Sequence, residues 1–403
     1  MNSRKNIQAQ RRILIVVENL PVPLDRRVWL EATTLRDHGY HVSVICPTGR
    51  GWDKLYEEID GVHIYRYPEP KEAHAGAIAY AREYGWSLWH MFRLARKVRR
   101  EQGFQVIHGC NPPDLIFLLG LWHRLRGVRY LFDHHDVCPE LFEAKFNKKG
   151  LLYRVMLIWE RMTFAAADVS IATNESFRQI AINRGRMKPE DVFVVRSAPR
   201  IEKFRPGAGD PSYRKGKGTL LAWVGVIGQQ EGLDLLVEAV DHLVNKMGKT
   251  DLHVAIVGFG PHQPVVEQDV RDHGLQDYFT FTGALYGEDL LKVLNAADIG
   301  VSPDPKNPMN DISTMNKVME YMTLEKPLVQ FDLKEGRASA ADASAYARAN
   351  DPIDFAEKTA ALMDDPDARA KMGAFGRKRV LENLSWEHSV PNLLAAYDRV
   401  FSK

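Results

Sequence analysis

Two side chains in the last third of the chain, Lys317 and Glu320, have the types and spacing to bind a phosphorylated ligand. They follow a loop rich in proline, asparagine and aspartate, and we expect a helix to begin at Asn316, capped by Ser313 or Thr314. A helix N-terminus binds anions because its N–H groups are unpaired and its dipole is positive there. A lysine in that first turn is unfavourable unless an anion such as a diphosphate lies in front of it. Glu320, on the same face, can then accept hydrogen bonds from ribose hydroxyls, and the alternative is a surface Lys–Glu pair.

A second polar group directly follows an expected strand and consists of Asp133, His134, His135 and Asp136. We expect His135 to hydrogen-bond a ligand hydroxyl, with Asp136 orienting its ring. Two histidines between two aspartates also suggest a metal site. However, consecutive residues of an extended segment point to opposite faces, so we expect no metal here. Asn111 and Glu140 lie at the ends of neighbouring strands, and we expect them to line the same cleft.

The loop after the first expected strand is rich in proline and leads to Asp25 and Arg26. It contains no GxGxxG pattern, which argues against a dinucleotide-binding dehydrogenase. We expect Asp25 to cap the helix that follows, and the alternative is that Asp25 and Arg26 contact a ligand.

Short apolar runs that alternate with amphipathic stretches define the elements that position these residues. The expected strands are 13–17, 41–45, 62–65, 106–107, 130–132, 169–172 and 192–195, and then 220–224, 253–257, 280–281, 299–301 and 328–331. Continuous apolar strands separated by helices predict parallel sheets covered on both faces, which is the α/β class. The pattern restarts after residues 198–218, a segment rich in proline, glycine and charge that suits a linker.

The sequence therefore predicts two tandem Rossmann-like domains, residues 1–198 and 199–385, that face each other across a cleft. We expect the last helix, within residues 386–403, to pack back on the first domain. A chain of 403 residues agrees with two domains, because one hydrophobic core rarely supports that length. Ligands of such sheets bind at the carboxyl ends of the strands, where the residues above lie.

Bulk composition excludes several classes of protein. A net charge of +2 gives no reason to expect a nucleic-acid partner. Cys46, Cys110 and Cys138 are far apart and form no metal pattern, so we expect free thiols. The polar start of the chain lacks a signal-peptide pattern, and the longest apolar run, 115–122, is far shorter than the roughly 20 residues that cross a bilayer. We expect a cytoplasmic protein, at the inner face of the plasma membrane.

Several motifs in consecutive order resemble the GT-B glycosyltransferases of family 4. They are PLDRRVWLEATTLRDHGYHVSVICP at 23–47, IVGFGP at 256–261, FTG at 281–283, KVMEYMTLEKPLVQFD at 317–332 and SWEHSVPNLLAAYDRVF at 385–401. The resemblance covers nearly the whole chain. The variant with DHHDV followed by PELFE is similar to bacterial enzymes that build exopolysaccharide or O-antigen-type glycans.

The resemblance assigns roles to individual residues. Glu320 matches the second Glu of the family's Glu-x7-Glu motif, which contacts the donor ribose, and His135 matches a histidine near the donor sugar. The first Glu of the motif falls at Ile312, with Asp311 beside it as a substitute. The residues after 220–224, where family members carry an Arg and a Lys for the pyrophosphate, are here GVIGQQEG. The backbone N–H groups from Gly225 to Gly228 would therefore have to supply more of the phosphate contacts. Lys317 and the helix terminus at Asn316 would contribute as well, and further candidates are Arg196 and then Arg337. Gly258 belongs to another motif on the donor side.

The resemblance also implies the reaction. Family members transfer a hexosyl group from a nucleotide sugar with retention of configuration and need no metal or other cofactor. We expect a UDP-sugar, with a GDP-sugar as the alternative, and a glycan or lipid-linked saccharide as acceptor. A nucleotide-sugar 2-epimerase and a non-catalytic partner subunit remain open, the latter because both expected basic residues are missing.

Residues 86–100 combine aromatic side chains, beginning at Trp86, with basic side chains that continue to Arg100. A basic amphipathic helix of this kind can lie on an anionic membrane. The alternative is a solvated helix with a buried aromatic stripe.

Overall fold

The structure is a computed structural model that describes residues 10–69, 77–146 and 149–403. The polar start of the chain falls mainly on residues 1–9, which lie outside the described residues. The described chain forms two compact units. The first contains residues 10–143, 149–195 and 389–403, and the second contains residues 144–146 and 196–388.

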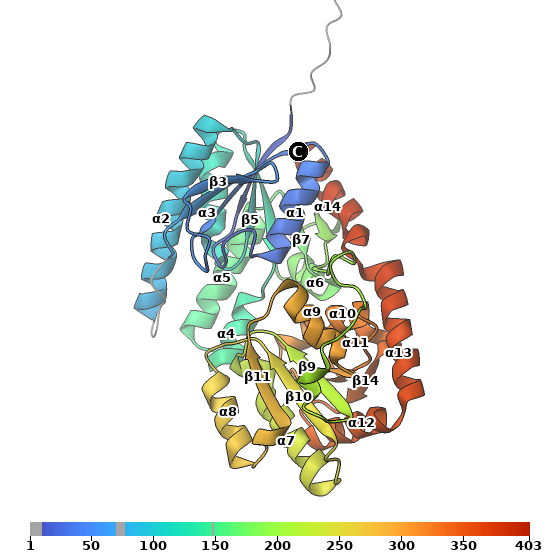
Figure 1. Cartoon of the computed structure of the whole chain (residues 1–403). Coiled ribbons are helices and arrows are strands. Elements are labelled where there is room, and N and C mark those ends of the chain that lie inside the picture. Colours follow the sequence, from blue (N-terminus) through green and yellow to red (C-terminus); the bar gives the residue numbers. More distant parts are fainter. Residues whose placement is uncertain (1–9, 70–76, 147–148) are drawn as a thin grey trace, which may run out of the picture. The chain divides into compact units, whose positions relative to one another are not determined.

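The described part of the first unit is built on an eight-stranded sheet in the order β3-β4-β2-β1-β5-β6-β7-β8. Figure 1 labels β3, β5 and β7 of this sheet. All neighbouring strands are parallel except β3 and β4. The strands are β1 (Arg12–Val16), β2 (His41–Pro47), β3 (Tyr56–Ile59), β4 (Val62–Tyr67), β5 (Val106–Cys110), β6 (Arg129–His134), β7 (Val169–Ala172) and β8 (Val192–Val194).

Helices cover both faces of this sheet. They are α1 (Arg26–Asp37), α2 (Ala77–Glu101), α3 (Phe117–Arg124), α4 (Cys138–Phe146), α5 (Leu151–Ala166), α6 (Glu175–Asn183) and α14 (Trp386–Phe401). Leu14 and Val16 of β1 pack with Met91 of α2 in one apolar cluster. On the other face, the ring Nδ1 of His108 in β5 lies 2.8 Å from the hydroxyl of Tyr397 in α14. The C-terminal helix is thus packed on the first unit.

The second unit is built on a six-stranded, fully parallel sheet in the order β11-β10-β9-β12-β13-β14. The strands are β9 (Thr219–Val224), β10 (Leu252–Val257), β11 (Phe279–Gly283), β12 (Ile299–Ser302), β13 (Leu328–Phe331) and β14 (Ser344–Ala347). The helices are α7 (Leu233–Asp241), α8 (Gln263–Asp272), α9 (Gly287–Ala296), α10 (Asn316–Thr323), α11 (Lys334–Ala340), α12 (Pro352–Asp364) and α13 (Pro366–Arg379).

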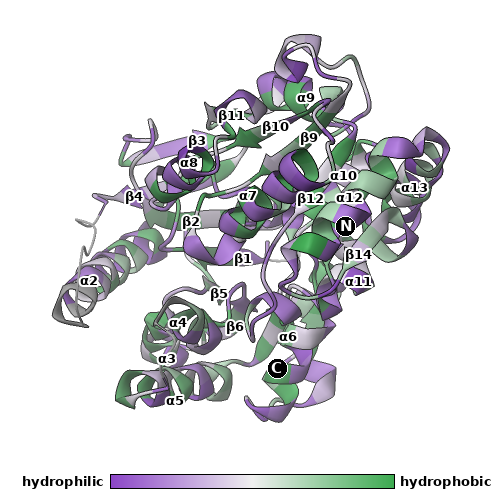
Figure 2. Cartoon of the chain, turned by 90° about the horizontal axis from the view of Figure 1, so that it is seen from below, coloured by the Kyte–Doolittle hydropathy of each residue, from purple (hydrophilic) through white to green (hydrophobic). Residues whose placement is uncertain are grey.

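Alternate residues of β9 belong to different apolar clusters, which shows that both faces of the second sheet are covered. Leu221 and Trp223 pack in the cluster that contains α7, α8 and α12, whereas Leu220 and Ala222 pack in the one that contains α9 and α10. Figure 2 shows the same arrangement, with β9 and β10 largely green and the helices around them alternating purple and green. This is the doubly covered parallel sheet that the sequence predicts.

Each sheet has a point where its strand order reverses. In the first unit it lies between β1 and β5, and in the second it lies between β9 and β12. Ligands of open α/β sheets bind beside such points, outside the carboxyl ends of the strands. The loops that follow β5 and β6, and those that follow β9 and β12, therefore carry the residues of interest.

The predicted strands and the helix at Asn316 are confirmed. The predicted cap of that helix is wrong. Met315 occupies the N-cap position without a side-chain hydrogen bond, and the hydroxyl of Ser313 instead donates to the carbonyl of Met309 over 2.8 Å. Residues 198–218 lie in the second unit, where Arg214 pairs with Asp298 at 2.7 Å. None of the helices in the described ranges has both the length and the apolarity of a bilayer-spanning segment.

Candidate active site

The second unit brings one buried cation and two carboxylates together at the reversal between β9 and β12. The ammonium of Lys317 lies 2.8 Å from Glu231 Oε2 and 2.8 Å from Asp304 Oδ1. It also lies 5.0 Å from the centre of the Trp223 ring, at cation–π distance. Lys317 is only 7% exposed, so this pairing, and not solvent, compensates its charge.

Two loops hold this cluster in place. The side-chain amide of Asn310 donates to the carbonyls of Gln230 (3.0 Å) and Pro305 (2.9 Å), which ties the loop after β9 to the loop after β12. Gly232 ends the first loop with a φ of +67°, and a Cβ there would come within 2.1 Å of the Pro303 carbonyl. Only glycine fits this close, left-handed turn, which places Glu231 beside Asp304.

The electrostatics of the cluster keep Lys317 charged. Burial alone lowers the pKa of Lys317, but Asp304 and then Glu231 outweigh burial and raise it above its ordinary value. Burial raises the pKa of the Glu231 carboxyl; Lys317 opposes this shift and Asp304 adds to it. Glu231 is therefore easier to protonate than an exposed glutamate.

The structure corrects how the loop after β9 was expected to bind phosphate. The N–H groups of Gly225, Ile227 and Gly228 donate to the carbonyls of Val257 (3.0 Å), Phe259 (3.0 Å) and Val226 (2.8 Å). They are thus occupied by the protein backbone. Glycine is needed at Gly258, with a φ of +141°, because a Cβ there would come within 1.8 Å of the Gly225 carbonyl oxygen.

The remaining residues expected on the donor side have mixed surroundings. Glu320 is 4% exposed, so the reading of Lys317 and Glu320 as a surface pair is wrong. Asp311 accepts a hydrogen bond from the backbone N–H of Lys334 over 2.9 Å. Arg196 and Thr314 are half-buried, and Arg337 is paired with Asp332, from which Nη2 lies 2.9 Å away.

The first unit holds a second buried polar network, around Asp133 at the end of β6. Arg27 donates to both oxygens of Asp133, over 2.7 and 3.1 Å, and Nε2 of His135 hydrogen-bonds to Oδ2 of Asp133. His108 Nε2 lies 3.4 Å from the same oxygen. Asp133, not Asp136, therefore orients the His135 ring, which corrects the sequence prediction.

The charges of this network assign the tautomer of His135. Burial alone raises the pKa of Asp133, but Arg27 and then His135 outweigh burial and hold it well below its ordinary value. The ionised carboxylate can only accept, so Nε2 of His135 carries the proton. In the neutral ring Nδ1 is then a hydrogen-bond acceptor, which suits it to receive a ligand hydroxyl.

His134 has a structural role. It is fully buried among Phe132, Phe164 and Phe177, and burial followed by the charge of Arg184 lowers its pKa to about 3. The prediction that His134 and His135 face opposite ways is thus confirmed.

Asn111 and Glu140 both make hydrogen bonds or ion pairs within the first unit. The Asn111 amide donates to the Asp136 carbonyl (2.7 Å), and its oxygen accepts from the N–H groups of His135 (2.7 Å) and Asp136 (3.2 Å). Asn111 therefore shapes the loop that carries His135. Glu140 is paired with both terminal nitrogens of Arg184.

Asp25 caps α1, because its Oδ1 accepts from the N–H of Val28 over 3.0 Å. This confirms the capping interpretation, and Arg26 follows it on the exposed side of the helix. Arg27 was not among the residues predicted from the sequence, and its i,i+4 spacing to Glu31, with which it pairs at 3.2 Å, is the local signal that could have indicated it.

One group of side chains in the described ranges has the spacing of metal ligands: Glu31, His108, Cys110 and Asp133. The guanidinium of Arg27 already pairs with both of its carboxylates, at 3.2 and 2.7 Å. Burial, followed by the charge of Asp133, raises the pKa of Glu31 well above its usual range, and burial raises that of the Cys110 thiol. A protonated acid, a protonated thiol and a resident cation make a poor metal site.

Comparison with known proteins identifies the protein family of the chain that carries these two sites. Residues 24–198 match the family described as "Glycosyl transferase 4-like domain", and residues 218–365 match the one described as "Glycosyl transferases group 1". The chain belongs to the family 4 glycosyltransferases of the GT-B fold.

Curated relatives agree with this assignment. The transferase is 26% identical over 303 residues to alpha-maltose-1-phosphate synthase of Mycolicibacterium smegmatis, which covers 68% of the transferase and 74% of the relative. It is 26% identical over 331 residues to alpha-D-kanosaminyltransferase of Streptomyces kanamyceticus, which covers 76% and 79%.

Solved structures share the fold of the transferase. Sucrose-phosphate synthase from Thermosynechococcus elongatus superposes with a TM-score of 0.78 at 17% identity, covering 98% of the transferase and 100% of that chain. HepE from Anabaena, solved with UDP and glucose, superposes with a TM-score of 0.73 at 12% identity, covering 96% and 100%. The predicted fold, two Rossmann-like α/β domains, is confirmed.

Proposed function

We propose that the transferase moves a hexosyl group from a nucleotide sugar, with UDP favoured over GDP, to a glycan or lipid-linked saccharide. The second domain, residues 199–385, binds the donor, and the first, residues 1–198, serves the acceptor. The observation that carries this proposal is the buried Lys317 cluster, with Glu320 one helical turn further on, at the strand reversal where ligands of such sheets bind. HepE, of the same fold, was solved with UDP and glucose.

The reaction that fits this site is retaining and independent of metal. The acceptor oxygen attacks the anomeric carbon from the face that the diphosphate leaves, and its proton passes to the departing phosphate oxygen. The anion needs a fixed positive charge as the glycosidic C–O bond breaks, and Lys317 supplies it. Glu231 and Asp304 are both engaged by that ammonium. Nδ1 of His135 accepts a hydroxyl of the sugar and positions it.

The proposed setting is cell-surface polysaccharide synthesis at the cytoplasmic face of the membrane. Residues 86–100 of α2 support it, because Trp86 and Trp89 are exposed on the same helix as four exposed basic residues. The DHHDV variant of the family motifs supports the same assignment.

The experiment is proton NMR of UDP-hexoses incubated with the protein and bacterial lipid extract, with and without EDTA. We expect an acceptor-dependent product with the anomeric configuration of the donor, unaffected by EDTA. An inverted product or loss of activity in EDTA would contradict the proposed mechanism. Conversion of the donor sugar without acceptor would instead identify a 2-epimerase, and absence of nucleotide binding would identify a non-catalytic subunit.

A further inference from the structure

Helix α2 presents an exposed stripe that changes character along its length. Between residues 86 and 100 the exposed residues recur at helical spacing, so they lie on one face, and they are Trp86, Trp89, Arg93, Arg96, Lys97 and Arg100. Trp86 is 46% and Trp89 57% exposed, which is unusual for side chains of this size. This stripe is aromatic at one end and cationic at the other, and the exposed Arg82 and Glu101 of the same helix flank it.

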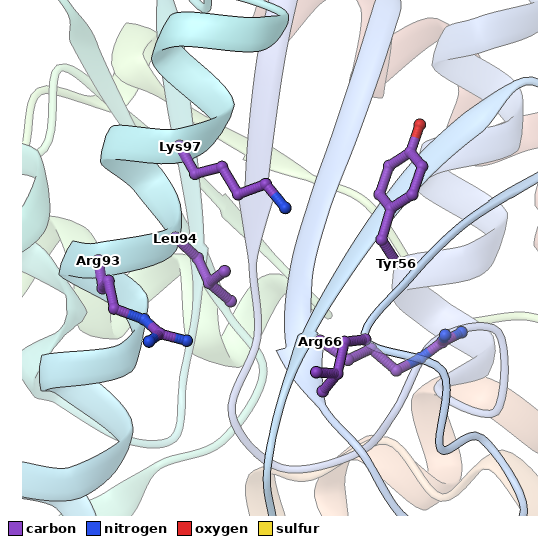
Figure 3. A pocket seen from close by; sticks show the side chains of 6 residues that line it. Tyr56, Arg66, Arg93, Leu94 and Lys97 are labelled. Carbon is purple, nitrogen blue, oxygen red and sulfur yellow. The ribbon is translucent and has the colours of Figure 1, made fainter.

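A cavity of about 200 Å³ opens beside the cationic end of this stripe, between α2 and the strands β3 and β4. Figure 3 shows Arg93, Leu94 and Lys97 projecting from α2 toward the side that carries Tyr56 and Arg66. Leu55, which is 59% exposed, completes the lining. The cavity thus combines three cationic side chains with an apolar wall.

The charges of this cavity are only partly compensated. The charge of Arg66 is compensated by Glu57 over 2.6 Å, and its terminal nitrogens also donate to the carbonyls of Lys54 (3.0 Å) and Val22 (2.6 Å). Only its buried Nε has no hydrogen-bond partner among the described residues. Lys97 lies 3.9 Å from Glu101, a distance at the limit of an ion pair. Arg93 has no carboxylate partner in the part of the chain that the structure describes, and its guanidinium instead lies 5.5 Å from the ring of Trp89. An anion that enters would therefore meet a positive field.

We propose that this cavity binds the phosphate of an anionic phospholipid and anchors the first domain on the membrane through α2. The inference rests on the membrane contact of the proposed function and adds a defined headgroup site to it. The volume of about 200 Å³ equals that of roughly seven water molecules, which suits one phosphate with part of its glycerol. The adjoining tryptophans suit the membrane interface, where amphipathic rings gather. Leu55 and Leu94 face the carbon atoms next to the phosphate.

A matched pair of double variants distinguishes a defined headgroup site from a general attraction between the basic helix and the anionic membrane. Arg93→Gln with Lys97→Gln removes two charges that line the cavity, and Arg96→Gln with Arg100→Gln removes two charges from the same stripe outside it. Arg93 and Arg96 have comparable surroundings, because each lies near one tryptophan ring: Arg93 is 5.5 Å from the Trp89 ring and Arg96 is 5.9 Å from the Trp122 ring. Exposed charges of this kind rarely decide whether a protein folds.

The measurement is co-sedimentation of the full chain with vesicles of phosphatidylcholine, with or without phosphatidylglycerol. We expect binding only to the anionic vesicles, and we expect the cavity variant to bind about tenfold more weakly than the stripe variant, because point contacts add to the general attraction of each cation. Equal losses in the two variants would overturn the headgroup site, and so would equal binding to neutral vesicles.

Two further arms complete the test. Soluble glycerol phosphate should displace the protein from vesicles only at a large excess over the accessible anionic lipid; displacement at concentrations comparable to that lipid would show that the cavity prefers a free phosphate ester, which overturns the lipid assignment. Thermal stabilisation by nucleotides is recorded on the same samples. Loss of nucleotide binding with retained vesicle binding would remove the proposed transferase function alone, and the reverse result would remove the membrane site alone.

Discussion

The ammonium of Lys317 lies between two carboxylates that differ in their freedom to move. The side chain of Asp304 is 1% exposed and receives a hydrogen bond from Ser302, whereas that of Glu231 is 20% exposed. A diphosphate that approaches Lys317 meets an excess of negative charge. Glu231, the more exposed of the two carboxylates, is the one that can move away from Lys317. This chain carries Glu231 in the loop where the family resemblance places a lysine, so the usual cation has been replaced by its opposite.

We predict that Glu231→Gln tightens the binding of the nucleoside diphosphate by at least about fivefold. The physical reason is that a like charge about 4 Å from a phosphate costs about 1 kcal/mol even in water. Isothermal titration calorimetry measures the effect. Glu325→Gln, at a half-exposed glutamate of the same unit, is the control and leaves the affinity unchanged. Unchanged or weaker binding by Glu231→Gln would show that Glu231 does not oppose the ligand.

The His135 ring depends on the ionised state of Asp133. An asparagine at 133 offers an N–H to Nε2, which moves the ring proton to Nδ1 and turns an acceptor into a donor. We predict that Asp133→Asn lowers turnover on the order of a hundredfold, the size of a positioned proton-transfer or hydrogen-bonding group. Circular dichroism and thermal unfolding check that the first unit is folded, and unchanged nucleotide binding shows that the donor site of the second unit is intact. Full turnover in a folded Asp133→Asn protein would remove His135 from the mechanism.

Local patterns in the sequence indicated some of these residues but not their partners. Lys317, Glu320 and the cap at Asp25 follow from helix periodicity and capping rules within a few residues. The partners of Lys317 lie 13 and 86 residues away, and Arg27 lies 106 residues from Asp133. No local rule brings such pairs together, since the strand order of the sheet does so.

At the scale of the elements, the parallel strands were predictable because both their faces are buried and their sequences are continuously apolar. The missed strands, β3 and β14, lie at the edges of their sheets, with the sequences YEEI and SAYA. Edge strands tolerate charged and small residues, so their sequences carry a weaker signal. The cap of α10 was missed because the Ser313 hydroxyl bonds back into the preceding loop.

The carboxyl end of β1 is linked to α2 by a buried acid. Glu18 accepts a hydrogen bond from Ser87 over 2.9 Å, and burial raises its pKa from 4.5 to about 7. The folded protein therefore holds this proton more tightly than the unfolded chain. Its contribution to stability is present below about pH 4.5 and is lost as the pH rises toward 7, by about 3 kcal/mol.

We predict that Glu18→Gln is as stable as the wild type at pH 4.5 and more stable at pH 8, by up to about 3 kcal/mol. Urea unfolding at a series of pH values measures the difference between the two curves, in which the titration of all other groups cancels. Glu190→Gln, at an exposed glutamate of the same unit, is the control. A constant offset between the wild-type and Glu18→Gln curves would contradict the raised pKa of Glu18.

At the scale of the whole molecule, we propose that the second unit binds the donor and that the first unit serves the acceptor. The fold class and the family were predictable because many weak motifs occur in the right order over nearly the whole chain. The phosphate contacts were not predictable, because the loop after β9 departs from the family pattern and its N–H groups bond to backbone carbonyls. The central claim is therefore that the Lys317 and Glu320 region of the second unit binds a nucleotide.

The measurement that tests this claim most directly is thermal unfolding in the presence of UDP, GDP, ADP or TDP. It compares the wild type with Glu320→Gln, and Glu325→Gln is again the control. A ligand that binds only the folded state stabilises it by about 3 kcal/mol at a hundredfold excess over its dissociation constant. We predict that one nucleotide, UDP first, raises the unfolding temperature of the wild type and of Glu325→Gln and has a much smaller effect on Glu320→Gln. If no nucleotide stabilises the wild type, or if Glu320→Gln responds fully, the donor site does not lie where we place it.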